Sequence, residues 1–347
     1  MKILYCVNNP YVDWNPYTAT IIDGLKRIDP EIKIYWGIER FWTVLASEVD
    51  IVHIMWPNEL LMQLRFSLKD LIERIKKLKR LGVRVVSTCH NMEAHYAISD
   101  VFNKAYEIIY ENSDIIFHLG EYSYEIFKEK YQNTRNVIIY HHIYDDRYKN
   151  RPTKSEARKV LRLSDDKKYL LCFGVLRHDE ERNMLVKISK RLKPFNVRII
   201  APGFYRVTYR RQIKDVLKHI FYRLIHPSIL MKMQGVKDKD LPLFFAASDI
   251  SLIMRMKILN SGNLPLGFYM GNVVVGPDLG NVGIILRKTG NVVFRPNDID
   301  SIVSSIISGL ELVNSGKGNQ NKIFAEKEYS SHKICSHMYS EYKQLLS

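Results

Sequence analysis

The stretch SLKDLIERIKKLKRLGVRVVSTCHN, residues 67–91, predicts a helix followed by a buried strand. Apolar residues recur every three or four positions in its first part, which predicts a helix over residues 67–81 that ends at Gly82. Its second part is a short run rich in valine, which predicts a strand over residues 83–88. Polar side chains follow at once. This succession of helix, buried strand and polar loop is the repeating unit of an α/β fold.

The same alternation extends along the chain in both directions. The polar stretch 145–168 interrupts it and is predicted to be a linker between two series. Further strands are predicted at residues 2–7, 31–36, 50–55, 115–119, 136–140, 169–174, 197–201, 229–235, 249–254 and 272–276. Further helices are predicted at residues 18–27, 96–111, 122–131, 182–192, 241–247, 264–270 and 298–313, and over much of 324–346.

We therefore expect an α/β protein with two Rossmann-like, doubly wound parallel-sheet domains that face each other across a cleft. The first domain is expected to span residues 1–148 and the second 149–327. Residues 328–347 are predicted to form a helix that crosses back to the first domain. Ligands of such sheets bind outside the carboxyl ends of the strands, so each domain is expected to provide one half-site.

The composition is that of an ordinary globular chain. Its 347 residues suit two domains, and 46% of them are hydrophobic, which excludes a mostly disordered chain. Four scattered cysteines without a CxxC pair exclude a disulfide scaffold and favour a reducing compartment. No apolar run reaches the ~20 residues that span a bilayer. The first residues lack a signal-peptide cleavage site and predict a strand, so we expect a cytoplasmic protein.

Basic residues are concentrated in the second half of the chain. The net charge is +15, but residues 1–150 carry 19 basic and 20 acidic side chains, whereas residues 151–347 carry 33 and 17. Within residues 177–239 the counts are 16 and 5. This imbalance predicts an anionic partner: a nucleotide diphosphate, an anionic membrane surface or nucleic acid. Because no nucleic-acid-binding motif occurs, we expect no nucleic-acid partner.

Residues 210–225 predict a basic amphipathic helix. An apolar stripe runs from Ile213 through Leu217 and Phe221 to Ile225, and five basic residues lie around it. One interpretation is a helix that docks on a membrane surface. The other is a helix packed on the core with a solvated basic face, and the pattern alone favours this second interpretation.

The loop after the predicted strand 83–88 carries the candidate catalytic group. His90 stands at the carboxyl end of that strand, where it could act as a general base or orient an acceptor hydroxyl. The alternative is a histidine that only caps a turn. A zinc site with His95 lacks a third ligand at suitable spacing, so no metal is expected. His53 lies inside an apolar strand and is expected to be a core residue or a residue at the edge of the cleft.

Two segments of the second half suit an anionic ligand. Arg177 follows the predicted strand 169–174 and could reach a diphosphate, with Arg182 on the next helix as a second candidate. The turn at residues 260–263 precedes a helix, so its free N–H groups could bind an anion. An ordinary capped helix start is the alternative there.

Several segments follow one another in the order of a known enzyme pattern. They are Asn15-Pro16-Tyr17, Asp50-Ile51-Val52-His53 with Trp56-Pro57, Thr88-Cys89-His90-Asn91 with His95, Phe173-Gly174 with Arg177, 241–253, Asn260-Ser261-Gly262 through Gly271, Val273–Pro277, and 330–346. In these segments the chain resembles glycosyltransferases of the two-Rossmann-domain (GT-B) type, near glycosyltransferase family 4. The resemblance covers most of the chain and rests on order and spacing rather than on one motif.

The resemblance implies transfer of a sugar, typically a hexose, from a UDP- or GDP-linked donor to a hydroxyl. The acceptor would be a glycan or a lipid-linked molecule of surface polysaccharide or glycolipid biosynthesis, reached at the inner face of the membrane. No cofactor or metal is implied, because helix dipoles and basic residues stabilise the leaving diphosphate. The first domain would bind the acceptor, with His90 as the catalytic residue. The implied acceptor-binding residues are Asn15, Tyr17, Asn91 and His95, and the implied donor-binding residues are Arg177, Arg182, Asn260, Ser261, Gly262 and Asn263.

The donor loop departs from the family pattern. Two glutamates normally precede its final glycine, but an alignment on Gly271 places Ile258 and Leu266 at their positions. No aspartate or glutamate occurs between residues 250 and 277. The carboxylate that would bind the ribose is therefore missing, and Asn260, Ser261 or Asn263 would have to replace it. The alternative is a non-catalytic relative that binds a glycan or nucleotide sugar in an assembly complex.

Overall fold

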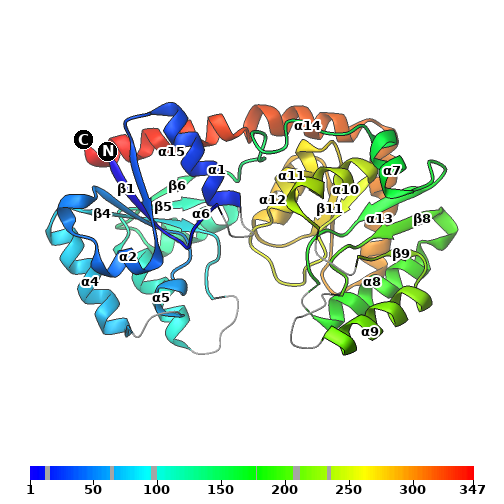
Figure 1. Cartoon of the computed structure of the whole chain (residues 1–347), viewed down its shortest axis with the longest axis horizontal. Coiled ribbons are helices and arrows are strands. Elements are labelled where there is room, and N and C mark those ends of the chain that lie inside the picture. The colour runs from blue at the N-terminus through cyan, green and yellow to red at the C-terminus, as the bar shows by residue number, and fades with distance from the viewer. Residues whose placement is uncertain (12–15, 63–65, 95–99, 177, 206–211, 233–235) are drawn as a thin grey trace. The chain divides into compact units, whose positions relative to one another are not determined.

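A computed structural model of the chain describes residues 1–11, 16–62, 66–94, 100–176, 178–205, 212–232 and 236–347. The chain divides into two compact units (Figure 1). Unit 1 comprises Met1–Asp146 together with Tyr329–Ser347, and unit 2 comprises Arg147–Glu328. Each unit contains a six-stranded parallel sheet with flanking helices, so the predicted α/β fold class of two Rossmann-like domains is confirmed.

The sheet of unit 1 has the strand order β2-β1-β3-β4-β5-β6. The strands are β1 (Lys2–Cys6), β2 (Lys33–Trp36), β3 (Ile51–Ile54), β4 (Arg84–Cys89), β5 (Ile115–His118) and β6 (Arg135–Ile138). The α-helices are α1 (Pro16–Ile28), α2 (Ile38–Thr43), α3 (Glu59–Met62), α4 (Leu68–Arg80), α5 (Asp100–Asn112), α6 (Glu121–Lys130) and α15 (Ser331–Leu346). Each predicted strand of this half is present, with ends shifted by two residues at most.

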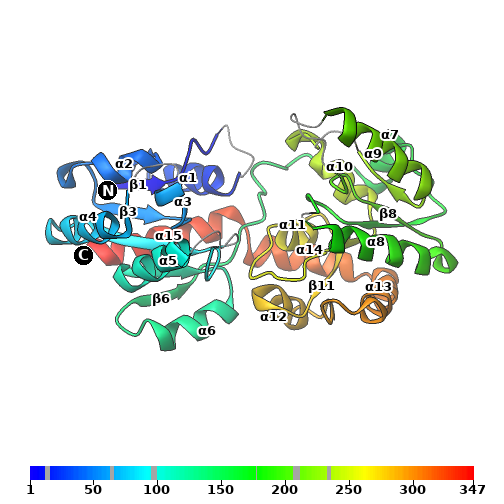
Figure 2. The ribbon, with the colours of Figure 1, turned by 90° about the horizontal axis from the view of Figure 1, so that it is seen from below.

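Both faces of the first sheet are apolar, which is why the strands are runs of hydrophobic residues rather than alternating patterns. Along β1, Ile3 and Tyr5 face a core shared with α1 and α15. The next residues in the chain, Leu4 and Cys6, face the opposite core, which α4 and α5 cover. Figures 1 and 2 show these helices on the two faces of the sheet.

Helix α15 comes from the end of the chain and completes one of these cores. It packs on α1 at Gly24, where a Cβ atom would lie 2.3 Å from the Cys335 sulfur, so only glycine fits. Its Tyr342 hydroxyl lies 2.6 Å from Nδ1 of His53 and 2.9 Å from the Tyr5 hydroxyl. Polar groups in the centre of unit 1 therefore satisfy one another across segments distant in sequence.

The sheet of unit 2 has the strand order β12-β11-β10-β7-β8-β9. The strands are β7 (Lys168–Leu171), β8 (Val197–Ile200), β9 (Ile229–Leu230), β10 (Ile250–Leu252), β11 (Val273–Pro277) and β12 (Val292–Phe294). The α-helices are α7 (Lys154–Leu161), α8 (Asp179–Arg191), α9 (Gln212–Ile225), α10 (Leu241–Ala247), α11 (Asn263–Tyr269), α12 (Gly280–Lys288), α13 (Ile299–Asn314) and α14 (Lys317–Glu328).

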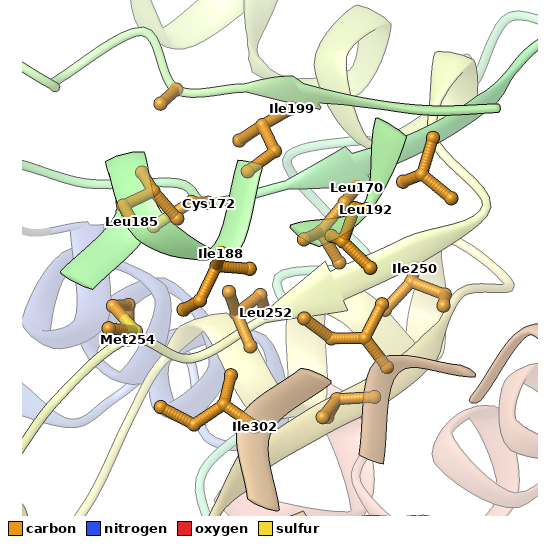
Figure 3. Packing of buried hydrophobic residues seen from close by; sticks show 14 of the residues in the cluster. Leu170, Cys172, Leu185, Ile188, Leu192, Ile199, Ile250, Leu252, Met254 and Ile302 are labelled. Carbon is orange, nitrogen blue, oxygen red and sulfur yellow. The ribbon is translucent and has the colours of Figure 1, made fainter. Parts of the chain in front are cut away.

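One face of the second sheet packs against α8 and α13. Figure 3 shows Leu170 and Ile250 from the sheet lying among Leu185 and Ile188 of α8 and Ile302 of α13. All of these side chains are fully buried. The spacing of Leu185, Ile188 and Leu192, at the end of α8, is the helical period, so these side chains lie on the one side of the helix that packs on the sheet.

The prediction of a linker over residues 145–168 is wrong in one respect, because it contains helix α7. A capping box starts this helix: the Thr153 side chain accepts from the Glu156 amide, and Glu156 accepts from the Thr153 amide. Its Arg158 is buried and donates to Asp249, 2.9 Å away. The charged composition that indicated a linker thus belongs partly to a buried ion pair. Helices α2, α3 and α12 and strand β12 were also not predicted.

Candidate functional site

The order of strands in unit 2 indicates where its ligand site lies. The chain proceeds from β7 to β8 on one side, and later places β10 on the other side of β7. Such a reversal opens a crevice at the carboxyl ends of the two central strands, where ligands of doubly wound sheets bind. The segments at this place are the loop after β7, the loop after β8 and the segment after β10.

Two of these loops touch through glycine backbones. Gly174, after β7, has φ +97°, a conformation that favours glycine. A Cβ atom on Gly203, after β8, would lie 2.3 Å from the Gly174 carbonyl oxygen. The Leu176 amide donates to the Gly203 carbonyl at 3.1 Å. The backbone of the loop after β7 is therefore held in place by a neighbour that has no side chain.

Arg255, after β10, lies at the same place. Its Nη1 donates to Glu181 at 2.9 Å, and its Nη2 donates to the Val175 carbonyl at 2.8 Å. A Cβ atom built on Gly174 would lie 3.8 Å from that Nη2. Because Glu181 is buried and paired with it, the guanidinium is fixed beside the glycine loop. The Arg255 guanidinium, held by this ion pair, therefore lies beside the glycine loop after β7.

Two of the predicted donor-binding residues, Arg182 and Asn263, contact the loop after β7, and Arg177 lies outside the described residues. Arg182 Nη1 donates to the Leu176 carbonyl at 2.7 Å, and its Nη2 pairs with Asp179. Asn263 Nδ2 donates to the Phe173 carbonyl at 3.0 Å. Both side chains thus hold the backbone of the loop after β7 from different helices.

The turn at residues 260–263 is fixed from α12. Asn281 Nδ2 donates to Asn260 Oδ1 at 2.7 Å, and the Asn281 amide donates to the Leu259 carbonyl at 3.0 Å. Ser261 accepts a bond from the Leu264 amide through its carbonyl, and Gly262 directly precedes α11. The structure therefore brings Asn263 to the glycine loop and anchors Asn260 elsewhere, on α12.

Unit 1 has an equivalent reversal of strand order between β1 and β3. At the carboxyl ends of its strands lies an aromatic cluster of Tyr17, Trp56, His90, His141 and His142. The Trp56 and His90 rings stack with centroids 4.8 Å apart, and the Tyr17 and His90 rings form a T-shaped pair with the same centroid separation of 4.8 Å. His142 stacks on Tyr17 at 4.9 Å.

The histidines of this cluster are neutral near pH 7. Desolvation by burial and, to a smaller extent, the neighbouring His141 together lower the pKa of His90 to about 3. Burial likewise lowers the pKa of His141 to about 4 and that of His142 well below its usual value. A neutral imidazole can donate one hydrogen bond and accept another, so His90 is suited to contact a hydroxyl group.

The other predicted acceptor-binding residues divide into three cases. Tyr17 is 1% exposed and packs among the histidines. Asn91 is half-buried beside His90, and its carbonyl accepts from the Tyr110 hydroxyl at 2.6 Å. Asn15 and His95 lie outside the described residues.

His53 is a core residue, as predicted. It is fully buried, and its two ring nitrogens lie within 2.7 Å of the Tyr342 and Thr88 hydroxyl groups. Among the residues that the structure describes, no group of three histidine, cysteine or carboxylate side chains is arranged to hold a metal ion. All four cysteines are buried and described, and none of them forms a disulfide.

Arg255, Glu181, Gly203 and Asn281 were missed by sequence reasoning. Each of these residues lies in a segment that is far from the others in the chain and comes close to them only in the folded structure. One signal was available: Arg255 follows a predicted parallel strand by a few residues, which is where such folds place ligand-binding groups.

Comparison with known proteins gives matches among solved structures alone: no protein-family model and no curated protein matches the chain. Sucrose-phosphate synthase from Thermosynechococcus elongatus matches with a TM-score of 0.74 at 11% identity, over 99% of this chain and 98% of that one. HepE from Anabaena, solved with UDP, matches with a TM-score of 0.72 at 13% identity, over 99% of this chain and 100% of that one. The UDP-GlcNAc 2-epimerase from Neisseria meningitidis, solved with UDP-GlcNAc, matches with a TM-score of 0.64 at 11% identity, over 99% of this chain and 100% of that one.

Sequence identities this low show that the fold is shared, and they do not show a shared activity or substrate. The first two proteins are glycosyltransferases of the GT-B type. The chain therefore has the two-domain fold of GT-B glycosyltransferases, a fold that the epimerase shares.

Proposed function

We propose that this chain is a glycosyltransferase that moves a sugar from a nucleotide-diphosphate donor to an acceptor hydroxyl. The observation that carries the proposal is the meeting of Gly174 and Gly203 beside Arg255 in unit 2. Bare backbone lets phosphate oxygens approach N–H groups closely, and a fixed guanidinium supplies charge-assisted hydrogen bonds. This combination suits a diphosphate at the end of a Rossmann-like strand.

In this proposal the donor lies against the loop after β7. Arg177 and Arg182 supply positive charge, and the turn from Asn260 to Asn263 contacts the sugar or the ribose. The leaving diphosphate is stabilised by these groups and by backbone N–H groups without a metal ion. The net charge of the segment 177–239, with 16 basic and 5 acidic residues, supports the choice of an anionic donor.

The acceptor hydroxyl is proposed to bind at His90, between Trp56 and Tyr17. A group with a pKa of about 3 is too weak a base to remove a hydroxyl proton efficiently at pH 7. We therefore assign His90 the task of orienting the hydroxyl by a hydrogen bond. Asn15, Asn91 and His95 complete the acceptor side.

The substrates are proposed to be a UDP- or GDP-linked hexose and a glycan or lipid-linked acceptor of surface polysaccharide or glycolipid biosynthesis. The enzyme would be cytoplasmic and would work at the inner face of the membrane. The contact is proposed to be peripheral. Among the described residues no helix is long and apolar enough to cross a bilayer.

The test begins with nucleotide binding. UDP, GDP, dTDP and CMP are added separately, and the melting temperature is recorded. A nucleotide at about 100 times its Kd stabilises by about 2.7 kcal/mol, which raises the melting temperature of a domain of this size by roughly 5–11 °C. Arg255→Met should abolish the rise, whereas Arg191→Met, which removes an exposed partner of Asp300, should preserve it.

Transfer is then measured with the sugar of the nucleotide that binds. His90→Ala should abolish transfer and leave the nucleotide-induced rise in melting temperature unchanged. Loss of nucleotide binding in this variant would refute the assignment of His90 to the acceptor side. No rise with any nucleotide would refute the proposed donor site.

A non-catalytic relative is the second candidate, and one observation favours it. The loop and helix from 250 to 277 contain no acid, so the usual ribose-binding carboxylate is missing. Such a protein would bind a nucleotide sugar or glycan within an assembly complex. Nucleotide binding without hydrolysis or transfer of any sugar would support this candidate, and measurable turnover by the pure protein would exclude it.

A further inference from the structure

Helix α9 is oriented with its polar side inward. Asp215 and His219, one turn apart, are 5% and 1% exposed and face unit 2. Tyr222 continues this face and packs against Phe204, and Asp215 accepts from the Tyr205 hydroxyl at 3.2 Å. An ordinary surface helix buries its apolar stripe instead.

The apolar stripe of α9 faces away from the protein. Ile213 is 78% exposed and Leu224 is 74% exposed. These side chains recur at helical spacing, so they form one continuous surface, which we call the α9 face. Its members are the exposed residues Ile213, Leu217, Ile220, Phe221, Leu224 and Ile225. The interpretation of this stripe as a core-packed face, which the sequence pattern favoured, is therefore wrong.

Positive charge borders the α9 face. Lys214 and Lys218 lie along one side of the stripe and Arg223 along the other, and all three are exposed. The single acid in the sequence of α9, Asp215, is the residue that is buried. An outward apolar stripe with cations on both flanks matches the two parts of an anionic lipid surface, acyl chains and charged headgroups.

We propose that the α9 face is the surface by which this protein docks on an anionic membrane. The apolar side chains enter the boundary between headgroups and acyl chains, and the lysines extend to the lipid phosphates. The inference gives the proposed peripheral location a defined surface. The inference rests on the residues of α9 alone, and membrane binding through this face requires neither the sugar donor nor the acceptor.

The test is sedimentation of the full chain with vesicles of equal parts phosphatidylglycerol and phosphatidylcholine, without nucleotide. Binding is expected to these vesicles and to be at least tenfold weaker to pure phosphatidylcholine. The double substitution Leu217→Glu with Leu224→Glu should abolish binding to the vesicles that contain phosphatidylglycerol. The matched control is Val160→Glu with Ile323→Glu, two exposed apolar residues on α7 and α14, which should bind as the wild type does.

The charged flank is tested separately. Each cation near an anionic surface contributes about fivefold to binding, so Lys214→Glu with Lys218→Glu should weaken binding by at least about 25-fold. Lys159→Glu with Lys327→Glu, on α7 and α14, is the control with the same change of charge. The tryptophan fluorescence added by Phe221→Trp should be quenched by brominated lipid, whereas the fluorescence added by Phe195→Trp should not be quenched.

Three results would overturn the proposal: no binding to the anionic vesicles, equal binding by the α9 and control variants, or self-association that depends on Leu217 in a protein that does not bind vesicles. The last result would make a second copy of the chain the occupant. Nucleotide binding is measured on the same variants and should not change. A failure of the membrane proposal is thereby distinguished from a failure of the proposed donor site.

Discussion

Gly203→Ala should damage both the stability and the nucleotide binding of unit 2. The new Cβ would lie 2.3 Å from the Gly174 carbonyl oxygen and 3.0 Å from the Val175 Cα, so it meets backbone rather than a movable side chain. Ordinary contact begins at 3.4 Å, which means that the two loops must separate by about 1 Å. Overpacking of this kind costs about 1–3 kcal/mol.

That cost corresponds to a fall in melting temperature of roughly 2–12 °C for a domain of this size. The displaced loop is the one proposed to receive the diphosphate. A hydrogen bond to a charged group contributes about 1.5–3 kcal/mol, so the loss of one lowers nucleotide affinity at least about tenfold. Melting curves and calorimetric titration with the nucleotide that binds measure the two effects.

Gly318→Ala is the matched control. Its Cβ would lie 2.1 Å from the Gly271 carbonyl oxygen, near the amino end of β11 and away from the carboxyl ends of the strands. It should destabilise the protein to a similar degree and leave nucleotide affinity unchanged. If Gly203→Ala melts and binds as the wild type does, the reasoning about the two glycine loops is refuted.

Three further results are expected. Arg158→Met should cost about 1.5–3 kcal/mol in urea denaturation because buried Asp249 loses one charged partner and keeps Lys154 as the other, and adding Asp249→Asn should recover part of the loss; strictly additive costs would contradict this. Burial lowers the pKa of His53 to about 3 in the folded state, so the unfolded chain binds its proton first and stability falls as pH drops from about 6.5. This histidine should lower the unfolding free energy by about 1.4 kcal/mol per pH unit in that range, and His53→Gln should remove that part of the slope. Asn281→Ala, which removes the hydrogen bond from Asn281 to Asn260, should weaken nucleotide binding about fivefold with turnover still measurable, and titration showing equal affinity would exclude a positioning role.

The sheets were predictable because parallel strands covered on both faces are apolar throughout. Predicted strand 83–88 and observed β4 differ by one residue at each end, and α10 was predicted with its observed ends, Leu241–Ala247. Helix α7 was missed because its polar composition resembles a linker, although Thr153 and Glu156 have the spacing of a capping box. Strand β12 was missed because its apolar run in the sequence, Val292–Phe294, is only three residues long, whereas the apolar runs around the similarly short β9 and β10 extend beyond those strands.

The candidate site was predictable where a strand end identifies it and not where two distant loops meet. His90 follows a buried strand directly, so its place could be inferred. Gly203 and Gly174 are 29 positions apart in the chain, and only their close approach shows that each must lack a side chain. For α9, periodicity predicted the apolar stripe, but it contains no information on which side of the helix faces the protein.

The packing of α15 on α1 affects the order in which the molecule can form during synthesis. Unit 2 is continuous in sequence and can fold as soon as Glu328 has left the ribosome. Unit 1 begins at Met1 but lacks Ile334, Met338 and Tyr342 of its own core until the last helix emerges. The sheet of unit 1, which is synthesised first, therefore has one incompletely covered apolar face while all of unit 2 is translated. A released chain that ends at Glu328 should bind holding chaperones through this face, whereas the chain that extends to Ser347 should not.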